Sequence, residues 1–166
     1  MKRIISLLLT LLLLCGMTAC GTKGMQEEEP PADNTMLANP WVEYDTRELA
    51  IAAAGFDMTA PESMEGYDAP IYRVMNAELL EVLYQSAAGE VRIRKAVGEE
   101  DISGDHNTYE ETQTIATPGE DGVVTMAGSG GAVACATWHS GAYTYAITAD
   151  PGLDVPAVAD LVNAVH

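Results

Sequence analysis

Residues 99–110 are rich in oxygen-bearing side chains, and oxygen atoms are the ligands that calcium prefers. When residue 99 is counted as position one, the ligand positions of a calcium loop hold Glu99, Asp101, Ser103, Asn107 and Glu110, and the turn position holds Gly104. Glutamate is long for the first position, and His106 stands where an apolar residue belongs. A polar loop with a turn at residues 103–105 explains the same pattern. We therefore expect no metal and keep calcium binding as the alternative.

The candidate nucleophiles lack partners at the right spacing. His139 and Ser140 are neighbours in a predicted turn, and no Gly-x-Ser-x-Gly motif surrounds the serine. Residues 128–131 are glycine-rich but lack the lysine and the following helix of a phosphate-binding loop. Cys135 lies in the apolar run 132–138, which predicts a buried, inert thiol. We expect no catalytic residue and no cofactor, with a carboxylate-using hydrolase as the alternative.

One basic cluster interrupts an otherwise acidic chain, at Arg92, Arg94 and Lys95. Arg92 and Arg94 alternate on a predicted strand, so they share one of its faces. We expect a solvated sheet face on which they pair with nearby carboxylates. An anion-binding face is the alternative.

The N-terminal residues predict export and lipid attachment. A short positive start precedes the apolar run 4–14, which is too short to span a bilayer comfortably. Residues 17–20, Met-Thr-Ala-Cys, resemble the lipobox of bacterial lipoproteins, although Met17 replaces the usual leucine. The resemblance implies cleavage before Cys20 and acyl chains such as palmitate on that residue. Two chains hold a protein stably on a membrane, here on its extracytoplasmic face.

The formal net charge is −17, and all of the predicted signal's charged residues are basic, so cleavage would leave the chain more acidic still. Such a charge repels nucleic acid and anionic lipid headgroups. We expect no nucleic-acid partner, and contact with the membrane only through the lipid on Cys20. Solubility is the simplest role for the charge itself.

Composition divides the chain into three parts. Residues 1–19 are the predicted signal peptide, and residues 20–39 are lipidated Cys20 followed by a disordered stalk rich in Glu and Pro. Residues 40–166 suit a single domain with one core. Cys135 would be the cysteine left in that domain, so no internal disulfide is expected.

The first predicted element of the domain is a helix. Asp45 can cap its N-terminus, with Glu48 three residues on to complete a capping box, and Gly55 suits its end. The residues expected to face inward are Leu49, Ala53 and Phe56.

After Pro61 the apolar pattern changes to a period of two, which predicts strands. They are expected at 71–75, 79–85, 90–94, 109–117, 122–127, 132–138 and 142–148, with turns at 86–89, 128–131 and 139–141. Trp138 ends an apolar strand and is expected to pack inside. A last helix after Asp154 has an apolar face formed by Val155, Val158, Leu161, Val162 and Val165. The fold class is α+β, an antiparallel meander of six or seven strands with an N-terminal and a C-terminal helix on one face.

The glycine and aromatic landmarks follow a recognisable order. They are Gly55-Phe56, Pro61, Gly66-Tyr67, Trp138 and Gly141 to Tyr143, before the closing helix. This order resembles the bacterial domain-of-unknown-function family numbered 4367, found mainly in envelope proteins of Gram-positive bacteria. The resemblance covers residues 41–166 and implies a single envelope domain, and it assigns no active-site residue.

Together these features predict a membrane-anchored lipoprotein of the cell envelope that binds an unidentified protein or ligand and is not an enzyme. The alternatives are a calcium-dependent envelope protein that uses residues 99–110 and an uncharacterised hydrolase. A lipid carrier is a third possibility, and it requires a deep apolar cavity between sheet and helices.

Overall fold

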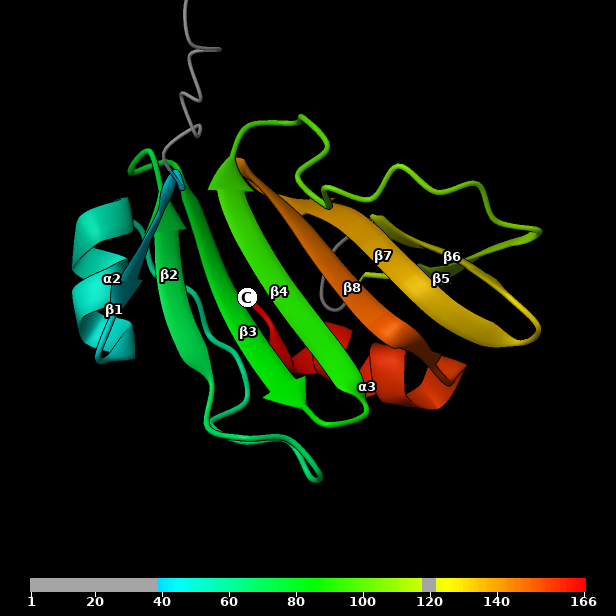
Figure 1. Ribbon diagram of the computed structural model, residues 1–166. Helices are drawn as coiled ribbons and strands as arrows, with labels where there is room; N and C mark the ends of the chain where they lie inside the picture. The colour runs from blue at the N-terminus through cyan, green and yellow to red at the C-terminus, as the bar shows by residue number, and fades with distance from the viewer. Residues whose placement is uncertain (1–38, 118–121) are drawn as a thin grey trace, which may run out of the picture. The chain divides into compact units, whose positions relative to one another are not determined.

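The computed structural model describes residues 39–117 and 122–166, which belong to one compact unit, Asn39–His166. Within these residues one sheet is accompanied by two helices (Figure 1). Along the chain the elements are β1 (Trp41–Tyr44), α2 (Arg47–Ala54), β2 (Ile71–Met75), β3 (Leu79–Ser86), β4 (Gly89–Val97), β5 (Glu111–Ala116), β6 (Val123–Ser129), β7 (Ala132–Ser140), β8 (Tyr143–Leu153) and α3 (Val155–Ala164).

The sheet has eight antiparallel strands in the order β1-β2-β3-β4-β8-β7-β6-β5. The prediction of an α+β fold with an antiparallel sheet is confirmed, but the prediction of six or seven strands in a meander is wrong. The sequence pattern missed β1, a strand of four residues whose backbone pairs with β2. It also missed that the chain leaves the meander after β4, since β8 pairs with β4 and β5 lies at the far edge.

Antiparallel partners lie on the same side of a sheet, so the register sorts the side chains into two faces. On one side, which we call the core face, a buried row crosses five strands through Val82, Ile93, Ile147, Ala136 and Met126. On the other side, the polar face, Arg73, Glu81 and Arg94 are cross-strand partners. Helix α2 contacts β1 to β3, and α3 contacts β7 and β8.

Helix α2 begins one residue later than predicted. Thr46, not Asp45, is the N-cap, because the Thr46 hydroxyl accepts the backbone N–H of Leu49 at 3.4 Å. The predicted end at Gly55 is confirmed, with a left-handed backbone at φ 81°. Ala50 and Ala54 are buried, whereas Leu49 is 52% exposed, so its predicted inward orientation is wrong. Small alanine side chains let the helix lie close to the strands that it contacts.

The remaining inward positions of this segment are partly confirmed. Ala53 and Phe56 are partly buried against the core, and the Phe56 ring lies 5.5 Å from that of Tyr143. At the other end of the chain, the predicted start of α3 after Asp154 is confirmed, and Asp154 Oδ1 caps the helix by accepting the backbone N–H of Ala157 at 2.8 Å. Of its predicted apolar face, Val158, Leu161, Val162 and Val165 are buried and Val155 is partly buried.

The hairpin between β7 and β8 is tighter than the sequence indicated. His139 and Ser140 belong to β7, so their placement in a turn is wrong, and the chain reverses at Gly141 with φ 59°. The prediction for Trp138 is confirmed, because its side chain is 3% exposed and stacks on Tyr145 with ring centroids 5.1 Å apart.

Candidate functional site

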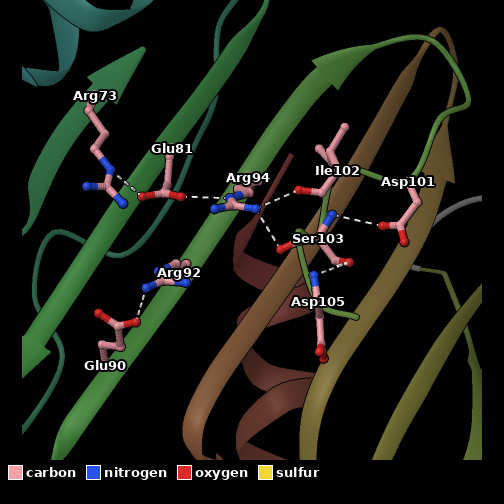
Figure 2. A network of polar contacts seen from close by, with 9 residues as sticks. All are labelled: Arg73, Glu81, Glu90, Arg92, Arg94, Asp101, Ile102, Ser103 and Asp105. Atoms are coloured by element: carbon pink, nitrogen blue, oxygen red, sulfur yellow. Dashed lines mark hydrogen bonds and ion pairs between the residues drawn. The ribbon is translucent and has the colours of Figure 1, made fainter. Parts of the chain in front are cut away.

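The connection from β4 to β5, residues 98–110, lies against the polar face, and we call it the crossing loop. It has to pass from the middle of the sheet to its edge, because β8, β7 and β6 lie between the two strands. Arg94 on β4 fastens it there: Nη1 donates to the carbonyl oxygens of Ile102 at 2.9 Å and Ser103 at 2.6 Å (Figure 2). The long connection is what builds the site described below.

Within the crossing loop, the side chains of Asp101, Ser103 and Asp105 each accept a hydrogen bond from the backbone two residues further on. Asp101 Oδ1 accepts the N–H of Ser103 at 2.8 Å, and Ser103 Oγ accepts the N–H of Asp105 at 3.1 Å. Asp105 Oδ1 then accepts the N–H of Asn107 at 2.9 Å. Short polar side chains stabilise turns in this way. Three successive turns therefore give this segment without helix or strand a defined path.

These turns bear on the candidate calcium ligands. Glu99, Asp101, Asn107 and Glu110 are exposed and Ser103 is buried. In the part of the chain that the structure describes, no group of three or more His, Cys, Asp or Glu side chains is placed to hold a metal ion. The structure thus does not bring Glu99, Asp101 and Glu110 together, and the oxygen atoms of Asp101 and Ser103 accept backbone hydrogen bonds instead.

A buried ion network on the sheet adjoins the crossing loop through Arg94 (Figure 2). Glu81 is fully buried on the polar face, with one carboxylate oxygen 2.5 Å from Arg73 Nε and the other 2.6 Å from Arg94 Nε. The Trp41 ring lies 4.7 Å from the guanidinium carbon of Arg73 and 5.5 Å from that of Arg94. We call these four residues the arginine network. Arg94 belongs both to it and to the anchoring of the loop.

The prediction that Arg92 and Arg94 pair with carboxylates is confirmed, by the ion pairs Arg92–Glu90 and Arg94–Glu81. The prediction that their face is solvated is wrong for Arg94, whose side chain is only 11% exposed, because the crossing loop contacts it. Lys95 points to the opposite face and is buried there. The basic cluster is therefore split between two environments.

Between the crossing loop and the sheet lies a cavity of about 520 Å³, which we call the polar cavity. Its walls come from β4 and the crossing loop that follows it, and from β7 and β8, which come later in the chain. The lining residues are Glu90, Arg92, Ser103, Gly104, Asp105, Asn107, Tyr109, Ala134, Thr148, Ala149, Asp150 and Gly152. The volume lies within the range of small-molecule binding sites.

On the sheet side of the polar cavity, two carboxylates lie beside one guanidinium. Glu90 and Asp150 are directly opposite each other on β4 and β8, and like charges so placed destabilise a sheet. Arg92 forms an ion pair with Glu90, and its Nε is buried with no hydrogen-bond partner. Among residues 39–117 and 122–166, no ion pair includes Asp150. Among these residues, the exposed carboxylate of Asp150 thus has no ion-pair partner.

On the loop side, Asp105 is held as an ionised carboxylate. Burial acts to raise the pKa of Asp105, but hydrogen bonds from the Tyr109 hydroxyl and from Asn107 outweigh it and hold the pKa below its usual value. Burial, together with the hydrogen bond to Asp105, raises the pKa of the Tyr109 hydroxyl. At neutral pH this side of the cavity therefore presents a fixed negative charge and a phenol that stays protonated.

Neither of the side chains weighed as nucleophiles is activated. Cys135 is half-buried on the polar face, and burial raises the pKa of its thiol to about 11, so the thiol is protonated at neutral pH. His139 is exposed on β7, and Ser140 follows it on the same strand, so the two side chains point to opposite faces. This geometry does not assemble a nucleophile with a base at these residues.

A second cavity, of about 340 Å³, lies where α3 packs on β7 and β8. Its lining is mixed, with Trp138, Tyr145, Val162 and Val165 beside Thr117, Ser140, Asn163 and His166. A lipid carrier requires a deep apolar cavity at this place. Half of the lining residues here are polar, which does not favour a lipid.

The predicted lipid site, Cys20, lies outside the described residues, as do the signal peptide and residues 21–38 of the stalk. None of the helices described here is long and apolar enough to cross a membrane. Comparison with family models, curated proteins and solved structures finds no match to this chain. The lipoprotein signal and the resemblance to the family numbered 4367 therefore stay predictions.

Three residues central to the site were not singled out from the sequence. Glu81 had a visible signal, because it is a lone charge in the otherwise apolar segment 79–84, and such a charge requires a partner. Asp105 and Asp150 had none, since they are two acidic residues among 25 Asp and Glu. Only the path of the crossing loop places them at one cavity.

Proposed function

We propose that this protein is a lipid-anchored, extracytoplasmic binding module that takes a small polar solute in the polar cavity and does not transform it. The observation that carries the proposal is the cavity itself, about 520 Å³ in volume and lined mainly by polar side chains from β4, the crossing loop and the β7–β8 hairpin. The arginine network and the turns of the crossing loop fix those segments before any ligand arrives. A preformed site loses less entropy when it binds.

Binding without chemistry is supported by how the cavity's polar groups are engaged. Glu90 is paired with Arg92, and Asp105 accepts hydrogen bonds from Asn107 and Tyr109. A general acid or base needs a pKa near the working pH, whereas the pKa of Asp105 is lowered and that of Tyr109 is raised. These groups are suited to hold a ligand and not to transfer its protons.

The location belongs to the same proposal. Lipid on Cys20 would tether the domain to the outer face of a cell membrane, and a stalk of residues 21–39 could extend at most ~60–70 Å. We take both helices to cover the core face, because the side chains that they bury belong to one cluster with the buried row of that face. The polar face, with its crossing loop, is then left for the ligand.

The binding claim is tested by blocking the cavity. The full chain in detergent is screened by thermal shift against amino acids, sugars, nucleosides, polyamines and short peptides. Ala134→Trp places a large side chain in the cavity wall, and His139→Trp adds the same group to an exposed position of the same strand outside it. At least one solute should raise the melting temperature of the wild type and of His139→Trp but not of Ala134→Trp.

Absence of any stabilising solute, or equal stabilisation of all three proteins, would contradict a site in the cavity. Each stabilising solute is then incubated with the chain and followed by mass spectrometry, together with generic esterase, peptidase, phosphatase and glycosidase substrates. Turnover that a single carboxylate or His139 substitution removes would show an enzyme.

The anchoring claim has its own test. Cells that express the wild type or Cys20→Ala are labelled with a fatty acid, and the protein is isolated. Label on the wild type alone is the expected result. Equal label on Cys20→Ala would refute lipidation at this residue.

A further inference from the structure

We infer that the solute of the polar cavity is a basic amino acid, which carries two cationic groups and one carboxylate. The inference rests on the proposed function and specifies its ligand. It follows from the charges that the cavity leaves unmatched, the groups that each of them requires, and the space available.

Three carboxylates and one guanidinium line the polar cavity. Arg92 and Glu90 form an ion pair and largely cancel each other. Asp105 and Asp150 form no ion pair with a Lys, Arg or His side chain of the described residues. The cavity therefore carries an excess of about two negative charges, one on the loop side and one on the sheet side.

Asp150 is exposed to solvent, and the sheet side favours a cation at this residue for a specific reason. Asp150 faces Glu90 across neighbouring strands, and Arg92 is bonded to only one of the two, Glu90. A cationic group at Asp150 would relieve this repulsion, and a second one would meet Asp105 on the loop side. Charged hydrogen bonds of ammonium or guanidinium to carboxylate are the strong ones in proteins.

A ligand that carries only positive charge offers no partner to Arg92, the guanidinium of the cavity. Arg92 lines the cavity with its side chain 36% exposed, and it pairs with Glu90 through Nη2. Thr148, its direct partner on β8, lines the same wall. A guanidinium beside a hydroxyl is a typical partner of a carboxylate. The combination favours a ligand with a carboxylate besides its cationic groups, which describes arginine or lysine.

Size is consistent with this class. Binding cavities for small molecules measure roughly 300–1,000 Å³. A cavity of about 520 Å³ accommodates one basic amino acid together with ordered water, which polar sites commonly retain.

The test is isothermal titration of the full chain in detergent with four related solutes. Arginine has all three charged groups, agmatine lacks the carboxylate, citrulline lacks the guanidinium charge, and glutamate reverses the balance of charge. Arginine should bind at least about tenfold more tightly than either agmatine or citrulline, the loss expected for one charged hydrogen bond. Glutamate should not bind.

Two variants test which charged group of the ligand each cavity residue meets. Circular dichroism confirms that each variant is folded. Asp150→Asn should weaken arginine by about tenfold or more, because it removes one of the two carboxylates that meet a cationic group of the ligand. Arg92→Gln should abolish the preference of arginine over agmatine, a ratio that a merely structural role would leave unchanged. Asp160→Asn, an exposed residue of α3 outside the cavity, is the matched control and should change neither value.

The inference is overturned if arginine binds no better than citrulline or glutamate, a comparison that needs no variant. It is also overturned if the arginine-to-agmatine ratio survives Arg92→Gln. If another solute binds and Ala134→Trp abolishes that binding, the ligand class is wrong while the proposed function stands. If nothing binds in the cavity, both fail.

Discussion

The arginine network makes a quantitative prediction about stability. Glu81→Gln keeps the shape of the side chain but removes the charge that two arginines share, and Glu81 is fully buried. The side chains of Arg73 and Arg94 are only 17% and 11% exposed, so water does not replace the carboxylate that they lose. Removing one member of a buried ion pair costs about 3–5 kcal/mol. The contact of both guanidinium groups with Trp41 remains, so we expect a loss near the lower end, about 3 kcal/mol.

The assay is urea unfolding of the full chain, followed by tryptophan fluorescence and, separately, by circular dichroism. A loss of about 3 kcal/mol is a large part of the 5–15 kcal/mol typical of a domain, and it corresponds to a fall in melting temperature of roughly 10 °C. The control removes the whole charge set, with Arg73→Met, Glu81→Leu and Arg94→Met together. Apolar replacement of a complete buried ion cluster is often neutral.

The triple variant should therefore be more stable than Glu81→Gln, although it also releases the crossing loop from Arg94. The reasoning is refuted if Glu81→Gln loses less than about 1 kcal/mol, which would mean that the arginines are solvated. It is equally refuted if the triple variant is the less stable of the two, because the charges would then stabilise the fold in their own right.

Four further predictions concern the loop and the core. Gly104→Ala should destabilise the chain by about 1–3 kcal/mol in urea unfolding, because Gly104 has φ +64° and an added Cβ would lie 2.5 Å from Arg94 Nη1; wild-type stability would show that the loop yields freely. Trp138→Ala should cost about 3–5 kcal/mol, and an unchanged melting temperature would refute its burial. Asp105→Asn should be less stable than the wild type at pH 7, by up to about 1 kcal/mol. Because the folded pKa of Asp105 is lowered, that difference is present above pH ~4 and should vanish as pH falls through the folded pKa; a difference independent of pH would contradict the assignment. Calcium titration of the full chain should show no micromolar site, and a one-to-one isotherm that Asp101→Ala abolishes would reverse this expectation.

Local signals in the sequence were sufficient for much of the fold. Gly55 ends α2 through its left-handed backbone and Asp154 precedes α3 with a side chain that caps it, and both predicted helix ends are confirmed. The strand 71–75 was predicted at its observed bounds, because it is a short run rich in β-branched and aromatic residues. The inward position predicted for Leu49 was wrong, since close approach of alanines to the sheet outweighed burial of this larger side chain. Such a choice depends on the space between elements, which periodicity does not contain.

The topology and the site depend on contacts between distant segments. Short strands such as β1 gain their hydrogen bonds from a partner about thirty residues away, so their own residues carry little signal. The sequence of the crossing loop contains no signal that β8, β7 and β6 lie between the strands that it connects. The polar pattern at residues 101–107 was visible and suggested ligands, whereas the structure uses Asp101 and Ser103 for turns. The acidic residues of the polar cavity became recognisable only from their shared location.

The most direct test of the polar cavity as a binding site is a map of backbone amide NMR shifts in the full chain as arginine and the screened solutes are added. A specific ligand should move the resonances of residues 103–109 and 148–152 together, with one dissociation constant, and Ala134→Trp should abolish the effect. His139→Trp should retain it. Shifts confined to other surfaces, or shifts that persist unchanged in Ala134→Trp, would contradict a ligand site beneath the crossing loop.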